Sequence, residues 1–80
     1  MDIMATALDG VMVLKPRVIE DRRGFFLESY SAKAFHKLGI DVHFVQDNHS
    51  RSVRGTLRGL HFQSSPGQGK LIRVAAGRIF

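Results

Sequence analysis

The sequence predicts an all-β fold with one short helix. Short segments rich in β-branched and aromatic residues are separated by polar turns that contain glycine or proline, and only one segment has helical periodicity. Five such strand segments with turns between them are typical of a sandwich or a barrel. The 80 residues are enough for one domain at most, and the 44% hydrophobic content argues against a disordered chain.

The first predicted strand covers residues 11–18, where apolar and β-branched residues are interspersed with charged ones. Pro16 lies inside this pattern. Because proline cannot donate a ladder hydrogen bond, it indicates an edge strand or a strand break. The polar residues 20–24 end in glycine and predict a turn, after which residues 25–30 alternate as the second strand.

Residues 31–39 are the one helical candidate. Ser31 suits the N-cap, since its hydroxyl can accept a hydrogen bond from the first turn, and Gly39 suits the C-terminal stop. A helix of about two turns needs tertiary support in water. The apolar residues that would provide this support fall on one face: Ala34, Phe35 and Leu38.

The second half of the chain is predicted to contain three further strands. They cover residues 42–49, 56–63 and 70–80. A turn-rich loop over residues 64–69 joins the last two. The final strand is apolar up to its last residue. We therefore expect residues 1–80 to be the N-terminal part of a single domain, truncated at its C-terminus.

The composition argues against several classes of protein. Without cysteine the chain has no disulfide framework and no thiolate metal site, which is compatible with a reducing cytosol. Asp9, Lys15 and Arg17 interrupt the N-terminal apolar stretch, so neither a signal peptide nor a membrane span fits. We expect a cytoplasmic protein that does not act on membranes.

The formal net charge is +5, from twelve Lys and Arg residues against seven Asp and Glu residues. Such a surplus attracts anions of any kind, including nucleic acid and phosphorylated small molecules. The basic residues are scattered, with no run longer than Arg22 and Arg23, whereas a nucleic-acid arm concentrates its charge. A small basic nucleic-acid binder, which would show steeply salt-dependent binding, is therefore the least favoured hypothesis.

The histidines do not have the spacing of a metal site in a small β-barrel. Such a site needs two histidines two residues apart on one strand face, with a carboxylate soon after. His61 is followed by Phe62 and Gln63 and has no partner, whereas His43 and His49 are six residues apart on opposite faces. The sequence therefore predicts no metal.

Two segments carry polar side chains that suit a nucleotide or a sugar. Gln46 and Asn48 share a strand face and can hydrogen-bond a sugar, a phosphate or a base edge, or they form a polar strand end that leads into a turn. Phe26 and Glu28 also share a face. Beside Arg23, an aromatic ring here could stack on a base while the guanidinium binds a phosphate. The alternative is a solvent-facing arginine beside core phenylalanines.

His61 and Lys70 are candidates for acid–base chemistry. A histidine titrates near neutrality, where a general base is most useful, although a lone histidine on a strand is more often structural. Lys70 either extends its ammonium group to solvent or stabilises a developing oxyanion in a pocket. Strict alternation places Arg58 and His61 on opposite faces. A shared pocket therefore requires a bulge, for which Gly59 is the natural place.

Four segments together resemble the motifs of the dTDP-4-dehydrorhamnose 3,5-epimerase family, in the family's order and at close to its spacing. They are residues 21–30 (DRRGFFLESY), 44–50 (FVQDNHS), 57–63 (LRGLHFQ) and 68–71 (QGKL). The resemblance implies a partial cupin-like jelly roll of antiparallel strands. It also implies a homodimer that exchanges an N-terminal strand, and an enzyme that needs no cofactor.

The resemblance further implies the reaction. The family substrate is dTDP-4-dehydro-6-deoxy-D-glucose, in which the C3 and C5 hydrogens flank the C4 ketone. Removal of either proton gives an enolate, and epimerisation leads to dTDP-4-dehydro-L-rhamnose for dTDP-L-rhamnose biosynthesis. By their place in the motifs, His61 is the expected catalytic base and Lys70 the cation beside the ketone oxygen.

Six further residues match substrate-binding positions of the family: Arg23, Phe26, Glu28, Gln46, Asn48 and Arg58. The resemblance assigns the first three to the nucleotide portion, in part across the dimer. It assigns the two amides to nucleotide-sugar contacts, and Arg58 to the sugar and diphosphate.

The resemblance also implies that parts of the catalytic machinery are missing. The family's tyrosine acid and the aspartate that orients the base correspond to positions beyond residue 80, and Tyr30 matches a different position. Because the reaction needs both groups, we expect the chain alone to be inactive or nearly so. The alternative hypothesis is a non-catalytic module that still binds dTDP or another nucleotide sugar.

Overall fold

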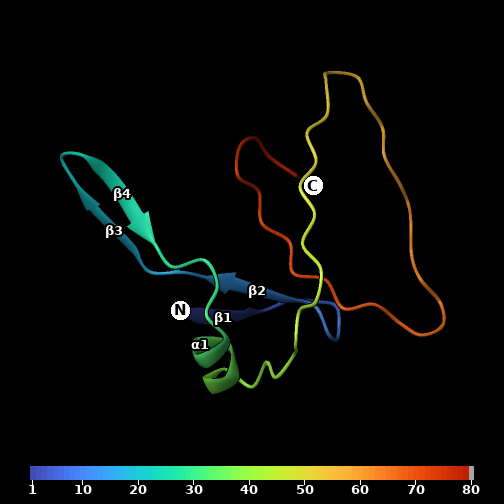
Figure 1. Cartoon of the computed structure of the whole chain (residues 1–80), viewed down its shortest axis with the longest axis horizontal. Coiled ribbons are helices and arrows are strands. Elements are labelled where there is room, and N and C mark those ends of the chain that lie inside the picture. Colours follow the sequence, from blue (N-terminus) through green and yellow to red (C-terminus); the bar gives the residue numbers. More distant parts are fainter. Residues whose placement is uncertain (80) are drawn as a thin grey trace. The chain divides into compact units, whose positions relative to one another are not determined.

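The computed structural model describes residues 1–79, which divide into two units (Figure 1). The first unit is Met1–Asn48, and the second begins at His49. All helices and strands of the described residues belong to the first unit, in the order β1, β2, β3, β4, α1. The strands form two separate two-stranded antiparallel sheets.

The first hairpin pairs β1 (Asp2–Ala5) with β2 (Met12–Lys15), so that the first residue of β1 lies opposite the last residue of β2. Thr6 organises the connecting loop. Its Oγ1 lies 2.9 Å from the carbonyl oxygen of Leu8 and 2.8 Å from that of Val11, and it accepts the Leu8 N–H at 3.2 Å. The sequence did not predict β1, since a segment of four residues that starts with aspartate is a weak strand signal.

The second hairpin pairs β3 (Val18–Asp21) with β4 (Gly24–Leu27) and turns through residues 22–23. Asp21 and Gly24 form the pair next to the turn, and Gly24 has a φ of +133°, where side-chain-bearing residues are strained. The positive φ therefore falls on the residue after the turn, while Arg22 and Arg23 at its centre keep negative φ. Among the described elements, β3 and β4 contact only each other.

Three predictions from the sequence concern β2, β3 and β4. The break at Pro16 is confirmed, because this residue lies between the end of β2 and the start of β3. The turn over residues 20–24 was wrong in extent, since only its two central residues turn while the others are paired. The strand over residues 25–30 begins one residue earlier and ends at Leu27.

The predicted helix is confirmed as α1 (Ala32–Lys37). Ser31 caps it, because its Oγ accepts a hydrogen bond at 3.2 Å from the N–H of the third helical residue. At the other end Gly39 has a φ of +84°, and the N–H of Ile40 donates to the carbonyl of Phe35 at 2.9 Å. This is the hydrogen-bond pattern of a Schellman C-terminus, which satisfies carbonyls that the helix leaves unpaired.

The core of the first unit is small and aromatic. Phe35 is 2% exposed and is the one buried hydrophobic side chain of the described residues. Tyr30 packs edge-on against Phe35, with ring centroids 4.8 Å apart, and edge-on against Phe44 at 5.7 Å. These rings attach α1 to the segments before and after it, which is the tertiary support that so short a helix requires.

The second unit contains neither helix nor strand in its described residues (yellow to red in Figure 1). Residues 42–48 of the first unit also lie outside any strand. The strands predicted over residues 42–49, 56–63 and 70–80 were therefore wrong wherever the structure describes them, and Phe80 lies outside the described residues. A strand requires a hydrogen-bonded neighbour. The one backbone–backbone hydrogen bond between described residues of this unit joins Thr56 to Val53 across a turn.

The predicted fold class is confirmed in its general form, since the regular structure is mostly antiparallel strands with one short helix. The cupin-like jelly roll stays a prediction. No helix within the described residues is long and apolar enough to cross a membrane.

Candidate functional site

The turn of the β3–β4 hairpin carries an ion pair between Arg23 and Asp21. The Arg23 guanidinium donates from Nη2 to Asp21 Oδ2 at 2.6 Å and from Nε to the same oxygen at 3.1 Å. The backbone N–H of Arg23 donates to Asp21 Oδ1 at 2.8 Å. The Asp21 carboxylate thus holds both the backbone and the side chain of Arg23.

The ion pair changes the titration of both groups. Hydrogen bonds from the Arg23 side chain, and then from its backbone N–H, lower the pKa of Asp21 below its ordinary value. The same side-chain pairing raises the pKa of Arg23. The side chains are 84% and 47% exposed for Arg23 and Asp21, so solvent screens their attraction and the pair orients the guanidinium more than it stabilises the hairpin.

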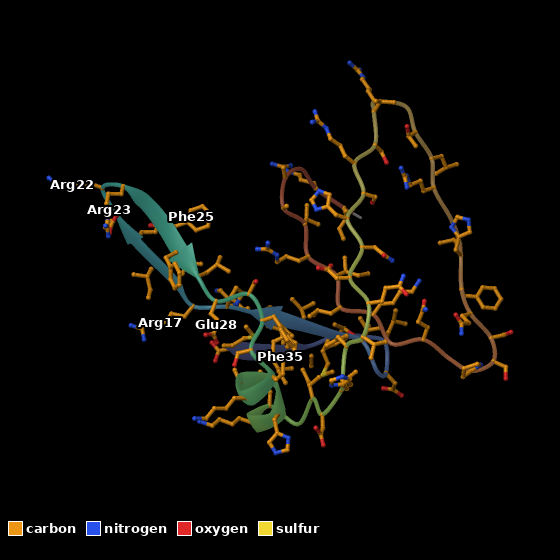
Figure 2. All side chains as sticks on the ribbon, in the orientation of Figure 1. Arg17, Arg22, Arg23, Phe25, Glu28 and Phe35 are labelled. Atoms are coloured by element: carbon orange, nitrogen blue, oxygen red, sulfur yellow. The ribbon has the colours of Figure 1, made fainter. Side chains whose placement is uncertain are left out.

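Aromatic side chains lie next to this cation. Phe25 and Phe26 follow the turn on β4 and are 70% and 69% exposed (Figure 2). A shallow depression beside them is lined by Ile19, Asp21, Arg23, Gly24, Phe25 and Phe26. In the ladder Phe26 lies opposite Ile19, so one face of the hairpin presents an apolar surface near the guanidinium. A planar base and a phosphate are the ligand groups that such a combination suits.

Glu28 lies apart from the hairpin tip. It follows the last residue of β4, whereas Arg22 and Arg23 occupy the turn at the other end (Figure 2). Four residues of extended chain from Gly24 span roughly 14 Å. The structure therefore brings Phe26 and Arg23 into one surface but leaves Glu28 at the base of the hairpin.

Gln46 and Asn48 are in contact, although the strand predicted for residues 42–49 is absent and alternation therefore does not explain the contact. Gln46 Nε2 donates to Asn48 Oδ1 at 3.2 Å, and both side chains are exposed. This contact leaves the Asn48 amide N–H groups and the Gln46 carbonyl oxygen for a ligand. Among the described residues, no hydrogen bond joins this pair to the β3–β4 hairpin.

Arg58, His61 and Lys70 lie in the second unit, and all three are exposed. None of them makes a hydrogen bond or ion pair with another described residue. Since this unit has no strand among its described residues, the alternation of faces does not apply to them. Gly59 has a φ of +111°, so the backbone departs from an extended conformation where a bulge was predicted, but without a ladder around it.

Asp21 is the site residue that the sequence analysis missed. It was treated as part of a polar turn, although a carboxylate two residues before an arginine is a recognisable signal. An aspartate at the start of a turn accepts the backbone N–H two residues on, which places the side chain of that residue within its reach.

The comparison with known protein families decides the assignment. The family model described as dTDP-4-dehydrorhamnose 3,5-epimerase matches residues 5–80. The chain belongs to this family. The match includes all four segments on which the resemblance was based, together with most of the first hairpin.

Individual members of the epimerase family support the assignment. The chain is 53% identical to dTDP-4-dehydrorhamnose 3,5-epimerase of Methanothermobacter thermautotrophicus, over 94% of this chain and 40% of that protein. It is 55% identical to the Pseudomonas aeruginosa enzyme of the same name, over 92% of this chain and 41% of that protein. It is 35% identical to dTDP-4-dehydrorhamnose 3-epimerase of Streptomyces niveus, over all of this chain and 40% of that protein.

The chain thus spans about two fifths of the length of these curated relatives. No solved structure matches the chain.

Proposed function

We propose that residues 1–80 are the N-terminal part of a single epimerase domain with a cupin-like jelly roll. The domain acts on dTDP-4-dehydro-6-deoxy-D-glucose and epimerises C3 and C5 in dTDP-L-rhamnose biosynthesis. The family match over residues 5–80 carries this proposal. The working enzyme is a cytoplasmic homodimer that exchanges an N-terminal strand and needs no cofactor.

The proposed chemistry requires a base and a cation. His61 removes the proton at C3 or C5, and Lys70 stabilises the negative charge that then develops on the C4 oxygen of the enolate. A fixed cation at a developing oxyanion contributes about 3 kcal/mol of transition-state stabilisation, which corresponds to about a hundredfold in rate.

Substrate binding is assigned to the six residues that match family positions. Arg23, Phe26 and Glu28 hold the nucleotide, and the exposed aromatic surface beside the guanidinium of the hairpin supports this role. Gln46 and Asn48 hold the nucleotide sugar as a hydrogen-bonded pair. Arg58 holds the sugar and the diphosphate.

The chain alone is proposed to be inactive or nearly so. Proton abstraction next to a ketone is accelerated in a site that excludes water and fixes its donors in place. His61 and Lys70 are both exposed, and neither has a described partner that would fix it. The acid and the base-orienting carboxylate are also outside this sequence, according to the family resemblance.

Deuterium exchange tests the proposal. The substrate is incubated in deuterated water, and incorporation at C3 and C5 is followed by NMR. The chain alone should show no exchange above the uncatalysed rate, and robust exchange would contradict the proposed inactivity. A chimera in which the chain is continued by the C-terminal part of the Pseudomonas aeruginosa relative should exchange both positions. Failure of a folded chimera to exchange either proton would contradict the family chemistry.

Substitutions in the same chimera test the two catalytic assignments. His61→Ala and Lys70→Ala should each slow exchange by about a hundredfold, because each removes a group that acts on the transition state. His36→Ala and Lys37→Ala are the matched controls, since both residues lie at the exposed C-terminal end of α1 and should leave the rate unchanged. Equal effects in both pairs would indicate a general loss of folding.

A second candidate function is a non-catalytic module that binds dTDP. One observation favours it: Arg23 and Phe26 lie on a formed hairpin, whereas His61 lies in a unit without regular structure in its described residues. Calorimetric titration of the chain with thymidine diphosphate tests this function. An absence of heat, with no change on Arg58→Ala, would count against it.

A further inference from the structure

The Asp21–Arg23 pair uses only one edge of the guanidinium. Asp21 accepts hydrogen bonds from Nε and Nη2 of Arg23, at 3.1 Å and 2.6 Å to Oδ2. Nε is also 3.3 Å from Oδ1. A guanidinium has five N–H groups in a planar fork. Within the described residues Nη1 has no partner, so the outer edge, formed by Nη1 and the second Nη2 hydrogen, is available.

The outer edge has the geometry that phosphate oxygens accept. Two parallel N–H groups of a guanidinium bind two oxygens of one phosphate at once, and this bidentate contact depends on the orientation of the plane. An exposed arginine without a partner samples many rotamers and must lose this freedom on binding. A carboxylate that already holds the inner edge reduces that loss.

We propose that Asp21 is a positioning residue that holds the inner edge of Arg23 so that its outer edge binds the diphosphate of a nucleoside diphosphate. This inference rests on the proposed function, in which Arg23 contacts the nucleotide portion of the substrate. Asp21 itself does not touch the ligand.

The backbone of the hairpin supports this role. The carboxylate that pairs with the guanidinium also accepts the backbone N–H of Arg23 at 2.8 Å. Asp21 belongs to the last pair of the ladder, opposite Gly24. The guanidinium is therefore fixed relative to β3 and β4, and with it relative to the exposed ring of Phe26 on the same hairpin. The side-chain hydrogen bond from Arg23 is the first cause of the lowered pKa of Asp21, as expected for a carboxylate that is paired in its ionised form.

Charge and positioning predict opposite effects for the substitution Asp21→Asn. Asp21 is a negative charge close to the proposed anion site. If only the net field mattered, its neutralisation would strengthen binding of a diphosphate. If Asp21 positions Arg23, the same neutralisation weakens binding, because asparagine retains an acceptor for the backbone N–H but loses the ionic contact with the guanidinium.

Glu20 provides the matched control. It precedes Asp21 on the same strand, carries the same charge, and makes no described ion pair. Glu20→Gln therefore removes one negative charge from the neighbouring position of β3 and leaves the Asp21–Arg23 ion pair intact. The difference between the two variants isolates positioning from charge.

The test measures the Kd of the whole chain for thymidine diphosphate. Asp21→Asn should bind about two- to fivefold more weakly than Glu20→Gln, the range expected for an exposed ion pair. When Arg23 has already been replaced by alanine, Asp21→Asn should cause no further weakening of thymidine diphosphate binding. Equal or tighter binding by Asp21→Asn, or an undiminished effect without Arg23, would overturn the inference while the proposed function stands.

If the unsubstituted chain does not bind thymidine diphosphate, the proposed nucleotide contact fails and the inference, which rests on it, fails too. A measurement without ligand distinguishes failure of the inference from failure of the proposed function. NMR of the Arg23 Nε–H tests the pairing without ligand: its resonance should move when Asp21 is replaced by Asn and remain in place for Glu20→Gln. An Arg23 Nε–H resonance that stays in place in Asp21→Asn would overturn the inference. Unchanged amide shifts in β3 and β4 would show that the hairpin is intact in each variant.

Discussion

The two units of the chain contain similar amounts of family motif but very different amounts of regular structure. In Met1–Asn48 each element is completed by residues close in sequence: the hairpins by turns of a few residues, and α1 by its own caps. From His49 onward the described residues have apolar alternation without a partner strand. Local hydrogen bonds thus define the hairpins and the capped helix, with the Tyr30 and Phe44 rings supporting α1, whereas alternation forms a strand only where a neighbour exists.

The largest expected effect concerns the single buried side chain. Phe35→Ala should remove about 3 kcal/mol from the stability of the first unit, through lost burial and the cavity left against Tyr30. This is comparable with the entire stability expected for a unit of this size. Loss of the helical circular-dichroism signal would measure it. Phe62→Ala in the second unit, where the ring is 88% exposed, should leave the spectrum unchanged.

A smaller effect is expected at the hairpin glycine. Gly24→Ala should destabilise the β3–β4 hairpin by about 1–2 kcal/mol, because its φ of +133° strains any residue with a Cβ. No atom lies within 4 Å of the added Cβ, so the cost is conformational rather than steric. Gly67→Ala in the second unit, where φ is not positive, should cost nothing. Amide hydrogen exchange of β3 should become faster in Gly24→Ala and stay unchanged in Gly67→Ala.

The helix cap provides the next prediction. Ser31→Ala should reduce the stability of α1 by about 1 kcal/mol, since the N–H that now donates to Oγ at 3.2 Å would lose its acceptor. Ser50→Ala is the matched substitution in the second unit, where the serine makes no described hydrogen bond. A thermal scan of the helical signal should respond only to the first. An equal fall in the melting temperature of both variants would contradict the absence of a described hydrogen bond at Ser50.

The smallest effect concerns pH. The folded pKa of Asp21 is lowered, so its pairing contributes to the hairpin above the unfolded pKa and is lost as pH falls through the folded pKa. The ¹³C shift of the Asp21 carboxyl should therefore titrate below the ordinary range, and Arg23→Ala should return it to that range. An ordinary titration of Asp21 in the unsubstituted chain would contradict the ion pair.

Features with local causes could be predicted from the sequence. The helix followed from Ser31 and Gly39, and the break between hairpins followed from Pro16, because a cap, a left-handed stop and a missing donor act on neighbouring residues. β1 was missed since its strand character depends on β2. The strands predicted after residue 41 failed because alternation says which side a residue would face and nothing about what it pairs with.

The same distinction between local and long-range causes applies to the residues of the candidate site. Gln46 and Asn48 are two residues apart, and the structure joins them directly although they lie outside any strand. The meeting of His61 with Lys70 would require the two predicted strands on either side of residues 64–69 to pair, and spacing along the chain does not specify such a pairing. The role of Asp21 has a local cause, since it accepts the backbone N–H of Arg23 two residues on. It was missed because residues 20–24 were predicted as a single turn.

The isolation of the β3–β4 hairpin has a consequence for how heat and nucleotide act on this chain. Because β3 and β4 contact no other described element, their unfolding is not cooperative with that of α1. A ligand that binds only the paired state would stabilise the hairpin by an amount that grows with the logarithm of ligand concentration above its Kd, and it would leave the helix unaffected. Saturating ligand should therefore separate two melting transitions that overlap in its absence, with the helical one at an unchanged temperature.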